Sequence, residues 1–164
     1  MNKKITANII TLNEEENIEA VIQSVQGVCD EIVVVDSQST DRTCEIAKSL
    51  GAKVIVQPYL GDGAQKAFGV QYATNDWILS IDADERLDND AIEQIKKLNL
   101  DETTYDAFSF ARKTYIGKAF IKLWYPDRVT RLYNKTKCAY STTGGHAKVE
   151  TNNISDLKAH MLHF

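Results

Sequence analysis

Residues 77–89 decide the fold of this chain and read Trp77-Ile78-Leu79-Ser80-Ile81-Asp82-Ala83-Asp84-Glu85-Arg86-Leu87-Asp88-Asn89. The apolar run at their start is typical of a buried β-strand. Asp82 and Asp84 follow at the exit of this strand, where side chains two positions apart project to the same side. At about 4 Å apart, their carboxylates would repel by roughly 1 kcal/mol in water and by more where partly buried. We therefore expect a cation beside this pair.

The first hundred residues alternate strand and helix patterns. Four β-rich segments are expected to be strands: Ile5–Thr11, Glu31–Asp36, Lys53–Val56 and Trp77–Ile81. Helices are expected at Ile18–Val25, from a cap at Ser39 or Thr40 to Leu50, at Gly63–Ala73 and at Ala91–Leu98. This order predicts an α/β fold, a Rossmann-like three-layer sandwich with a mostly parallel central sheet and helices on both faces.

Ligands of such sheets bind beyond the carboxyl ends of the strands. Polar residues stand at three of these ends, in the segments Thr11–Asn13, Asp36–Asp41 and Asp82–Asp84. We expect the three loops to converge on one crevice. Within it, Asp36 could accept a hydrogen bond from a nucleotide base, and Lys66 could pair with a phosphate.

The pattern changes after Leu100. Tyr105–Lys113 and Arg128–Tyr133 are expected to be strands, and an aromatic and basic stretch, Tyr115–Pro126, separates them. This stretch could pack in the core, but the interleaved lysine and tryptophan in Lys118–Tyr125 also suit contact with a membrane surface or a lipid acceptor. With no flexible linker in view, residues 1–164 are expected to form a single domain.

Composition excludes several classes of protein. A net charge of -4, without long runs of Lys or Arg, gives no support to nucleic-acid binding. The three scattered cysteines are expected to be reduced thiols of a cytoplasmic protein. The apolar segment at the N-terminus lacks a signal-peptide cleavage site, and no apolar run is long enough to span a bilayer. We expect a soluble protein, or one bound to a membrane only at its surface.

The residues present do not match the motifs of three common types of ligand site. A dinucleotide fold needs a glycine-rich turn after the first strand, where this chain has Leu12-Asn13-Glu14-Glu15-Glu16. The segment Gly61–Lys66 does not match a P-loop. Residues 82–93 do not form an EF-hand, because Arg86 and Leu87 replace a ligand and the required glycine. A metal-dependent site for a nucleotide sugar fits better, with Mg²⁺ or Mn²⁺ between the acidic pair and a diphosphate.

In its motifs, the chain resembles the family 2 glycosyltransferases of GT-A fold, and most of all the bacterial lipopolysaccharide core β-glucosyltransferase-like enzymes. The motifs that carry the resemblance are Ile9–Glu15, Glu31–Thr43, Gln65-Lys66, Asp82–Arg86, Trp124–Asp127, Arg131–Tyr133 and Leu162-His163. They extend over almost the whole chain. They are specific for fold and reaction class, and much less so for the sugar.

The resemblance implies an inverting transferase that moves a sugar, with a UDP-hexose favoured, from a nucleoside-diphosphate sugar to a lipopolysaccharide-core or other glycan or glycolipid acceptor. Residues 1–100 would be the nucleotide-sugar-binding half and residues 101–164 the acceptor-side half. Asp84 would be the main ligand of a divalent cation, Mg²⁺ or Mn²⁺, with His163 completing the site and Asp82 near the ribose or metal. The nucleoside pocket would be lined by Thr11, Asn13, Glu15, Asp36 and Asp41.

The chain departs from the family at the acceptor side. Relatives usually carry His-Glu where this chain has His146-Ala147. Inversion needs a carboxylate to deprotonate the acceptor hydroxyl, and Asp127 and Glu150 are the nearest alternatives. Most relatives also continue beyond the terminal histidine with helices, so a truncated or catalytically impaired form, a nucleotide-sugar-binding or partner module, is a second hypothesis. A nucleotidyltransferase is a weaker third, because its phosphate loop is missing.

Purely structural roles are the alternative for several of these residues. Asn13 could be a helix cap and Glu15 a first-turn acid, and Asp41 could serve as the N-terminal charge of a helix. Lys66 could be a surface lysine, and His146 and His163 could be structural. The donor base, the sugar, the acceptor and the oligomeric state are not fixed by the sequence. We expect a cytoplasmic protein that acts at the inner face of the membrane.

Overall fold

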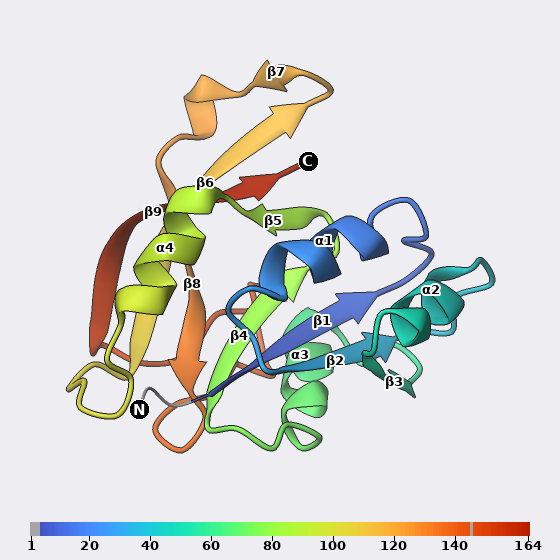
Figure 1. Cartoon of the computed structure of the whole chain (residues 1–164), viewed down its shortest axis with the longest axis horizontal. Coiled ribbons are helices and arrows are strands. Elements are labelled where there is room, and N and C mark those ends of the chain that lie inside the picture. Colours follow the sequence, from blue (N-terminus) through green and yellow to red (C-terminus); the bar gives the residue numbers. More distant parts are fainter. Residues whose placement is uncertain (1–3, 145) are drawn as a thin grey trace.

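The structure is a computed structural model that describes residues 4–144 and 146–164. It is an α/β fold built on one curled sheet, with the strand order β3-β2-β1-β4-β8-β6-β9-β5 and the short β7 paired with β6 (Figure 1). The strands are β1 (Ile5–Thr11), β2 (Glu31–Asp36), β3 (Lys53–Val56), β4 (Trp77–Asp82), β5 (Glu85–Leu87), β6 (Ala107–Ile116), β7 (Ala119–Phe120), β8 (Asp127–Asn134) and β9 (Ile154–His163). The helices are α1 (Ile18–Val25), α2 (Thr43–Ser49), α3 (Asp62–Val70), α4 (Asn89–Lys97) and the 3₁₀ turn η1 (Lys122–Trp124).

The first four strands form the parallel part of the sheet. β1 pairs in parallel with β2 and with β4, and β2 pairs in parallel with β3. The register aligns Thr11 with Asp36 and Ile10 with Asp82, so the carboxyl ends of three strands meet at one edge. The predicted mostly parallel sheet and the convergence of these loops are confirmed.

Helices cover both faces of the parallel strands because β1 is apolar on one face and polar but buried on the other. Ile5, Ala7 and Ile9 join the main core with the apolar stripe of α1. On the opposite face, Asn8 donates a hydrogen bond to the carbonyl of Lys66 in α3 at 2.7 Å. A Cβ on Gly69 of α3 would lie 2.1 Å from Oδ1 of Asn8, so this close approach requires glycine.

The second part of the sheet returns the chain to the acidic strand exit. β8 pairs antiparallel with β4 and β6, and β9 pairs in parallel with β6. The last strand then pairs antiparallel with β5, in a register that places Glu85 opposite His163. This arrangement brings Glu85 and His163, which are 78 positions apart in the sequence, to the same edge of the sheet, beside Asp82 and Asp84.

The cap of α2 and the end of α3 are among the local details that differ from the sequence-based expectation. The predicted cap of α2 at Ser39 or Thr40 is wrong, because Asp41 accepts the hydrogen bond from the backbone N–H of Thr43 at 3.0 Å. Helix α3 ends at Val70 rather than at Ala73, in a turn closed by the backbone of Gly69 and Val70.

Two further findings concern the cysteines and the helices. Cys29 and Cys44 are partly buried free thiols, and Cys138 is a buried one. Among the helices in the described part of the chain, none combines the length and the apolar composition that crossing a bilayer requires.

Candidate functional site

Three hollows adjoin at the carboxyl edge of the parallel strands. A pocket of about 300 Å³ lies between the β1, β2 and β4 loops and is lined by Ile10, Thr11, Leu12, Glu14, Ser37, Tyr59, Asp62, Asp82, Ala83 and Asp84. It shares Asp62 and Asp82 with a polar cleft of about 940 Å³. That cleft shares Arg112 and Asp127 with a third hollow of about 460 Å³, which reaches His163. The acidic strand exit therefore lies at the junction of the first two hollows, and His163, which is next to Asp84, connects this junction to the third.

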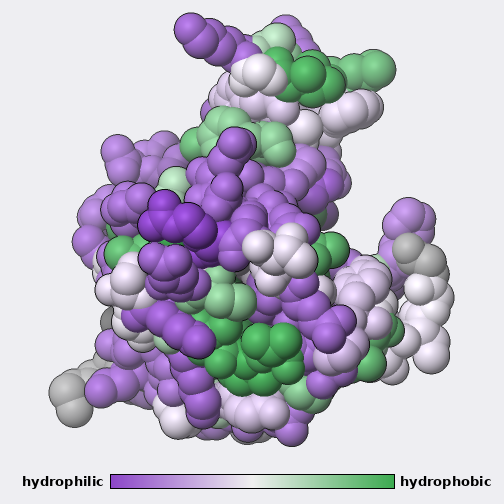
Figure 2. Space-filling view, turned by 90° about the vertical axis from the view of Figure 1, so that its right-hand side faces the viewer, coloured by the Kyte–Doolittle hydropathy of each residue, from purple (hydrophilic) through white to green (hydrophobic). Residues whose placement is uncertain are grey.

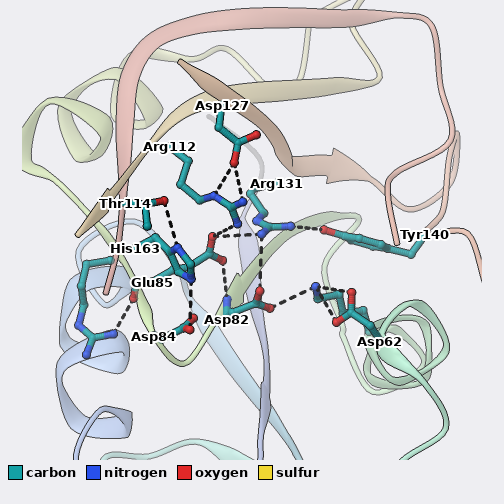
Figure 3. Close-up of polar contacts among 12 residues, drawn as sticks. Asp62, Asp82, Asp84, Glu85, Arg112, Thr114, Asp127, Arg131, Tyr140 and His163 are labelled. Carbon is teal, nitrogen blue, oxygen red and sulfur yellow. Dashed lines mark hydrogen bonds and ion pairs between the residues drawn. The ribbon is translucent and has the colours of Figure 1, made fainter. Parts of the chain in front are cut away.

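Asp84 and His163 form the open part of this junction (Figure 3). Nε2 of His163 lies 3.3 Å from Oδ2 of Asp84, and Nδ1 lies 3.2 Å from the hydroxyl of Thr114. The side chain of Asp84 keeps 39% of its surface exposed. The hydrogen bond with Asp84 raises the pKa of His163, against the opposing effect of partial burial. This aspartate and histidine can therefore hold a proton or a cation between them.

Asp82 has a different environment, because cations of the protein surround it. Nζ of Lys66 lies 3.2 Å from Oδ1 of Asp82, and Nη2 of Arg131 lies 3.6 Å from Oδ2. Burial alone would raise the pKa of Asp82, but Arg131 and Lys66 outweigh it and hold this pKa below its usual value. The expected repulsion between the two aspartates is thus relieved at Asp82 by side chains, which leaves Asp84 as the carboxylate open to a ligand.

A buried ion pair supports the strand exit from below. Glu85 is fully buried, accepts a hydrogen bond from the backbone N–H of Asp82 at 2.9 Å, and accepts another from Nη2 of Arg131 at 3.0 Å. Arg131 also donates to the hydroxyl of Tyr140 at 3.0 Å. Burial would lower the pKa of Arg131, but Glu85, Tyr140 and Asp82 raise it well above its usual value. These contacts hold Asp82 in one position without help from a ligand.

Lys66 is buried rather than placed on the surface. Its side chain is 4% exposed and its Nζ lies 3.0 Å from Oδ1 of Asp62, in addition to the contact with Asp82. The ammonium also lies 5.4 Å from the centre of the Tyr140 ring. Both carboxylates that it contacts line the 300 Å³ pocket and the 940 Å³ cleft. Lys66 is thus a buried positive charge in contact with the carboxylates that line the junction.

The residues expected around the nucleoside form a hydrogen-bonded frame at the ends of β1 and β2. Thr11 donates to Oδ1 of Asp36 at 2.9 Å and lines the 300 Å³ pocket. Asn13, in the left-handed region with φ of 52°, accepts from the backbone N–H of Thr40 at 2.8 Å. The backbone N–H of Glu15 donates to Asp41 at 3.1 Å. These contacts tie the two loops together, and Asp36 lies buried beneath them.

The two candidate bases lie in the second half of the chain, which the sequence analysis expects to be the acceptor side. Oδ2 of Asp127 accepts from Nε of Arg112 at 2.9 Å, and Asp127 borders both the 940 Å³ cleft and the 460 Å³ hollow. Glu150 is exposed and lines the 940 Å³ cleft, as do His146 and Ala147. Ala147 packs close to α3, since a Cβ on Gly63 would lie 3.3 Å from its own Cβ.

A divalent cation fits part of this donor set. Carboxylate oxygen and imidazole nitrogen are ligands that Mn²⁺ accepts, and carboxylate oxygen suits Mg²⁺. Within residues 4–144 and 146–164, no group of three or more His, Cys, Asp and Glu side chains is arranged to hold a metal. Asp84 and His163 offer two ligands, and Mg²⁺ sites that bind substrate phosphates commonly use only one or two carboxylates of the protein, with water and phosphates as the other ligands.

Sequence reasoning missed three charged residues of the site. Glu85 and Arg131 lie within motifs that carry the family resemblance, but the sequence assigned no role to them or to Arg112. In the structure, Nη1 of Arg112 lies 3.7 Å from the fully buried carboxylate of Glu85. A usable signal was the position of Arg131 directly before Leu132 and Tyr133 in the expected strand Arg128–Tyr133, because a charge in a buried part of a strand normally has a buried partner.

Comparison with known sequences places the chain in a family. The family model described as Glycosyl transferase family 2 matches residues 6–155. An uncharacterized glycosyltransferase of Rickettsia bellii is 42% identical over 147 residues, which make up 87% of this chain and 50% of that protein. The lipopolysaccharide core biosynthesis glycosyltransferase LpsC of Rhizobium meliloti is 34% identical over 117 residues, 68% of this chain and 43% of that protein. The chain spans about half the length of the curated relatives it matches.

Solved structures agree on the fold. TarS of S. aureus in complex with UDP-GlcNAc superposes with a TM-score of 0.70 at 17% identity, over 98% of this chain and 59% of that one. Glucosyl-3-phosphoglycerate synthase of Mycobacterium tuberculosis, in complex with Mn²⁺, UDP and glucosyl-3-phosphoglycerate, superposes with a TM-score of 0.51 at 28% identity, over 71% of this chain and 46% of that one. By its family match and by its GT-A-like fold, this chain belongs to glycosyl transferase family 2.

Proposed function

We propose that the chain is the catalytic domain of an inverting glycosyltransferase that takes a hexose from UDP-hexose. In this proposal the nucleoside lies in the 300 Å³ pocket above Asp36, and the diphosphate reaches the junction at Asp82 and Asp84. Asp84 and His163 would hold a divalent cation, Mg²⁺ or Mn²⁺. The related synthase of Mycobacterium tuberculosis, which was solved with Mn²⁺ and UDP, supports a cation and this donor class.

The observation that carries the proposal is the contrast between the two aspartates. Asp82 is compensated by Lys66 and Arg131, whereas Asp84 is partly exposed and has His163 as its neighbour. A site that must accept a diphosphate needs one carboxylate free for a cation and needs the remaining negative charge neutralised. The buried cations meet the second requirement, and Asp84 meets the first.

The chemistry that this arrangement favours is departure of an anionic leaving group. A cation at Asp84, when bound, would stabilise the charge that builds on the diphosphate as the bond to the sugar breaks. Lys66 adds a fixed positive charge behind the same point. Because it is buried, its effect is screened by water less than that of a surface lysine.

For the acceptor base, Asp127 is favoured over Glu150. One oxygen of Asp127 is engaged by Arg112, and the residue borders both hollows on the acceptor side. The acceptor is proposed to be a glycan or glycolipid of the cell envelope, which the likeness to a lipopolysaccharide core glycosyltransferase supports. A cytoplasmic location at the inner face of the membrane belongs to the same proposal.

Isothermal titration with UDP, GDP, CDP and ADP in the presence of Mn²⁺ or Mg²⁺ tests the donor site. UDP is expected to bind, and to bind more weakly after the metal is removed with a chelator. If none of the four nucleotides binds with either metal, the proposal is wrong.

A second candidate function, a nucleotide-sugar-binding module without transferase activity, is favoured by one observation. The family resemblance implies a glutamate at the position of Ala147, and the alanine side chain has no group that can accept a proton. This candidate predicts that UDP binds but that UDP-hexose is neither transferred nor hydrolysed. Measured release of UDP from UDP-glucose above the rate of an Asp84→Asn variant would exclude it.

A further inference from the structure

The hairpin formed by the end of β6, β7 and η1 has an unusual composition. Residues 107–126, which comprise all of β6 and the hairpin proper (residues 113–125), contain four basic residues and no acidic one, although the whole chain has a net charge of -4. The basic residues are Arg112, Lys113, Lys118 and Lys122. Since Arg112 is paired with Asp127, the lysines supply the positive charge of the hairpin itself. A cationic segment on an acidic protein points to an anionic partner.

The hairpin also exposes apolar side chains. It extends away from the body of the protein in Figure 1, and Figure 2 shows hydrophobic residues beside hydrophilic ones on the same projection. Leu123 is 90% exposed, Ile116 is 64% exposed and Trp124 is 54% exposed. Lys118 and Lys122 are exposed next to them. Lysines that flank tryptophan, leucine and isoleucine are typical of segments that enter the interface of a lipid bilayer.

The hairpin is held to the body by a series of aromatic contacts. The ring of Phe164 stacks on Tyr115 at 5.7 Å between centres, Tyr115 contacts Phe120 at 5.7 Å, and Phe120 contacts Tyr125 at 5.7 Å. The hydroxyl of Tyr125 lies 3.1 Å from Nε2 of His160. Leu123 and Ile116 are more exposed than any of these four rings. The hairpin is thus built to present these side chains rather than to bury them.

The base of the hairpin opens onto the candidate site. Trp124 and Pro126 line the 460 Å³ hollow together with Arg112, Thr114, Asp127 and His163. A surface in contact with the tip would therefore face the mouth of this hollow. An acceptor anchored in that surface could enter from the hairpin side and meet Asp127 before it reaches Asp84.

We infer that the hairpin of residues 113–125 docks the protein on an anionic lipid bilayer. Leu123, Ile116 and Trp124 enter the interface, while Lys113, Lys118 and Lys122 contact the lipid headgroups. The bilayer presents a glycolipid acceptor to the 460 Å³ hollow, and this last step rests on the proposed function. The docking surface itself does not, because it contains no residue of the donor pocket.

Flotation with lipid vesicles tests the inference. The chain is mixed with vesicles of phosphatidylcholine alone, or with vesicles in which roughly a third of the lipid is anionic phosphatidylglycerol. It is expected to float with the anionic vesicles, less so at high salt, and only weakly with the neutral ones. A Lys118→Glu/Lys122→Glu variant should lower the partition coefficient at least about tenfold, since each cation near such a surface contributes roughly a fivefold factor. Leu123→Asp should lower it by a similar amount.

Two control variants match these changes elsewhere on the surface. Lys96→Glu/Lys97→Glu makes the same charge change on α4, and Val56→Asp places the same acid at an exposed position of β3. Both should leave flotation within about twofold of the original chain, because neither lies on the hairpin. Circular dichroism of every variant confirms that it is folded.

Three results would overturn the docking surface. The original chain could fail to float with anionic vesicles, or the hairpin variants could float as it does. The third is a dimer in size-exclusion chromatography that Leu123→Asp dissociates without any binding to vesicles, which would make the hairpin a contact between two copies. UDP titration of the same variants separates the two proposals: normal UDP binding with no flotation refutes the docking surface alone, and flotation without UDP binding refutes the donor site alone.

Discussion

The buried pair of Glu85 and Arg131 provides the sharpest test of how the strand exit is held. In a Glu85→Gln variant, one oxygen can still accept from the backbone N–H of Asp82, but an amide N–H₂ group would face Nη2 of Arg131, which lies 3.0 Å from the present carboxylate oxygen. Two donors then oppose each other. Arg131 would also keep a single carboxylate partner, Asp82 at 3.6 Å.

The expected magnitude follows from these contacts. Breaking a buried ion pair by removing one partner costs roughly 3–5 kcal/mol. Because Asp82 continues to compensate Arg131, we expect the lower end, a loss of about 3 kcal/mol in the free energy of unfolding. For a chain of this size the loss corresponds to a fall of roughly 6–12 °C in Tm.

Urea denaturation followed by tryptophan fluorescence measures the loss, with the buried Trp77 as one reporter. Glu93→Gln is the matched control, because Glu93 forms an exposed pair with Lys96 at 3.5 Å. That variant should change the free energy of unfolding by less than about 0.5 kcal/mol. If Glu85→Gln and Glu93→Gln lose the same small amount, the buried pair does not support the site as described.

Two further predictions concern the same region. In the presence of a chelator, the original chain should be more stable than Asp84→Asn, because the hydrogen bond with Asp84 favours the protonated ring of His163. This extra stability should be full below about pH 6.5 and should decline as the pH rises through the raised pKa of His163. Urea midpoints at several pH values measure the difference in stability, and a difference that does not change with pH would contradict the prediction. Gly63→Ala should lower the free energy of unfolding by about 1–3 kcal/mol, since the new Cβ would lie 1.9 Å from the carbonyl oxygen of Ser141. The control, Gly27→Ala, places a Cβ where no atom lies within 4 Å, so it should cost far less. Thermal unfolding compares the two variants, and equal losses of stability would argue against the close approach of α3 to Ser141.

The parallel half of the fold could be predicted because its signals are local. β1 and β2 are short, apolar and β-branched, and α1 shows its buried stripe of Ile18, Val21, Ile22 and Val25 in the sequence itself. β5 could not be predicted, since its three residues, Glu85–Leu87, carry two charges and are a strand only because β9 pairs with them.

β9 was missed for a related reason. Leu157, Ala159 and Met161 alternate towards the core, but charged and polar residues between them hide the pattern. Without this strand, the neighbourhood of Asp84 and His163 could be expected only from family resemblance. The register of β9 against β5 and β6 is a long-range property, and it determines that Thr114 and Asp84 flank the same imidazole.

The cap of α2 and the cations that contact Asp82 could not be predicted from the sequence for the same reason. Ser39 was a reasonable cap by residue type, yet its hydroxyl donates to Asp36 at 2.6 Å and is therefore engaged elsewhere. Likewise, the sequence indicates that Asp82 and Asp84 need a cation, but it does not reveal that Lys66 and Arg131 already supply one to Asp82. Both outcomes depend on contacts between distant parts of the chain.

The central claim is that Asp84 holds the cation through which the donor diphosphate binds, and its most direct test is UDP titration with Mn²⁺ in Asp84→Asn and Asp88→Asn. The second variant is a matched control, because Asp88 also faces a histidine, His160 at 3.5 Å, and asparagine preserves its cap of α4. We predict that Asp84→Asn weakens UDP binding at least about tenfold with Mn²⁺ and removes its dependence on the metal, while Asp88→Asn binds as the original chain does. Unchanged, metal-dependent binding in Asp84→Asn would contradict the claim.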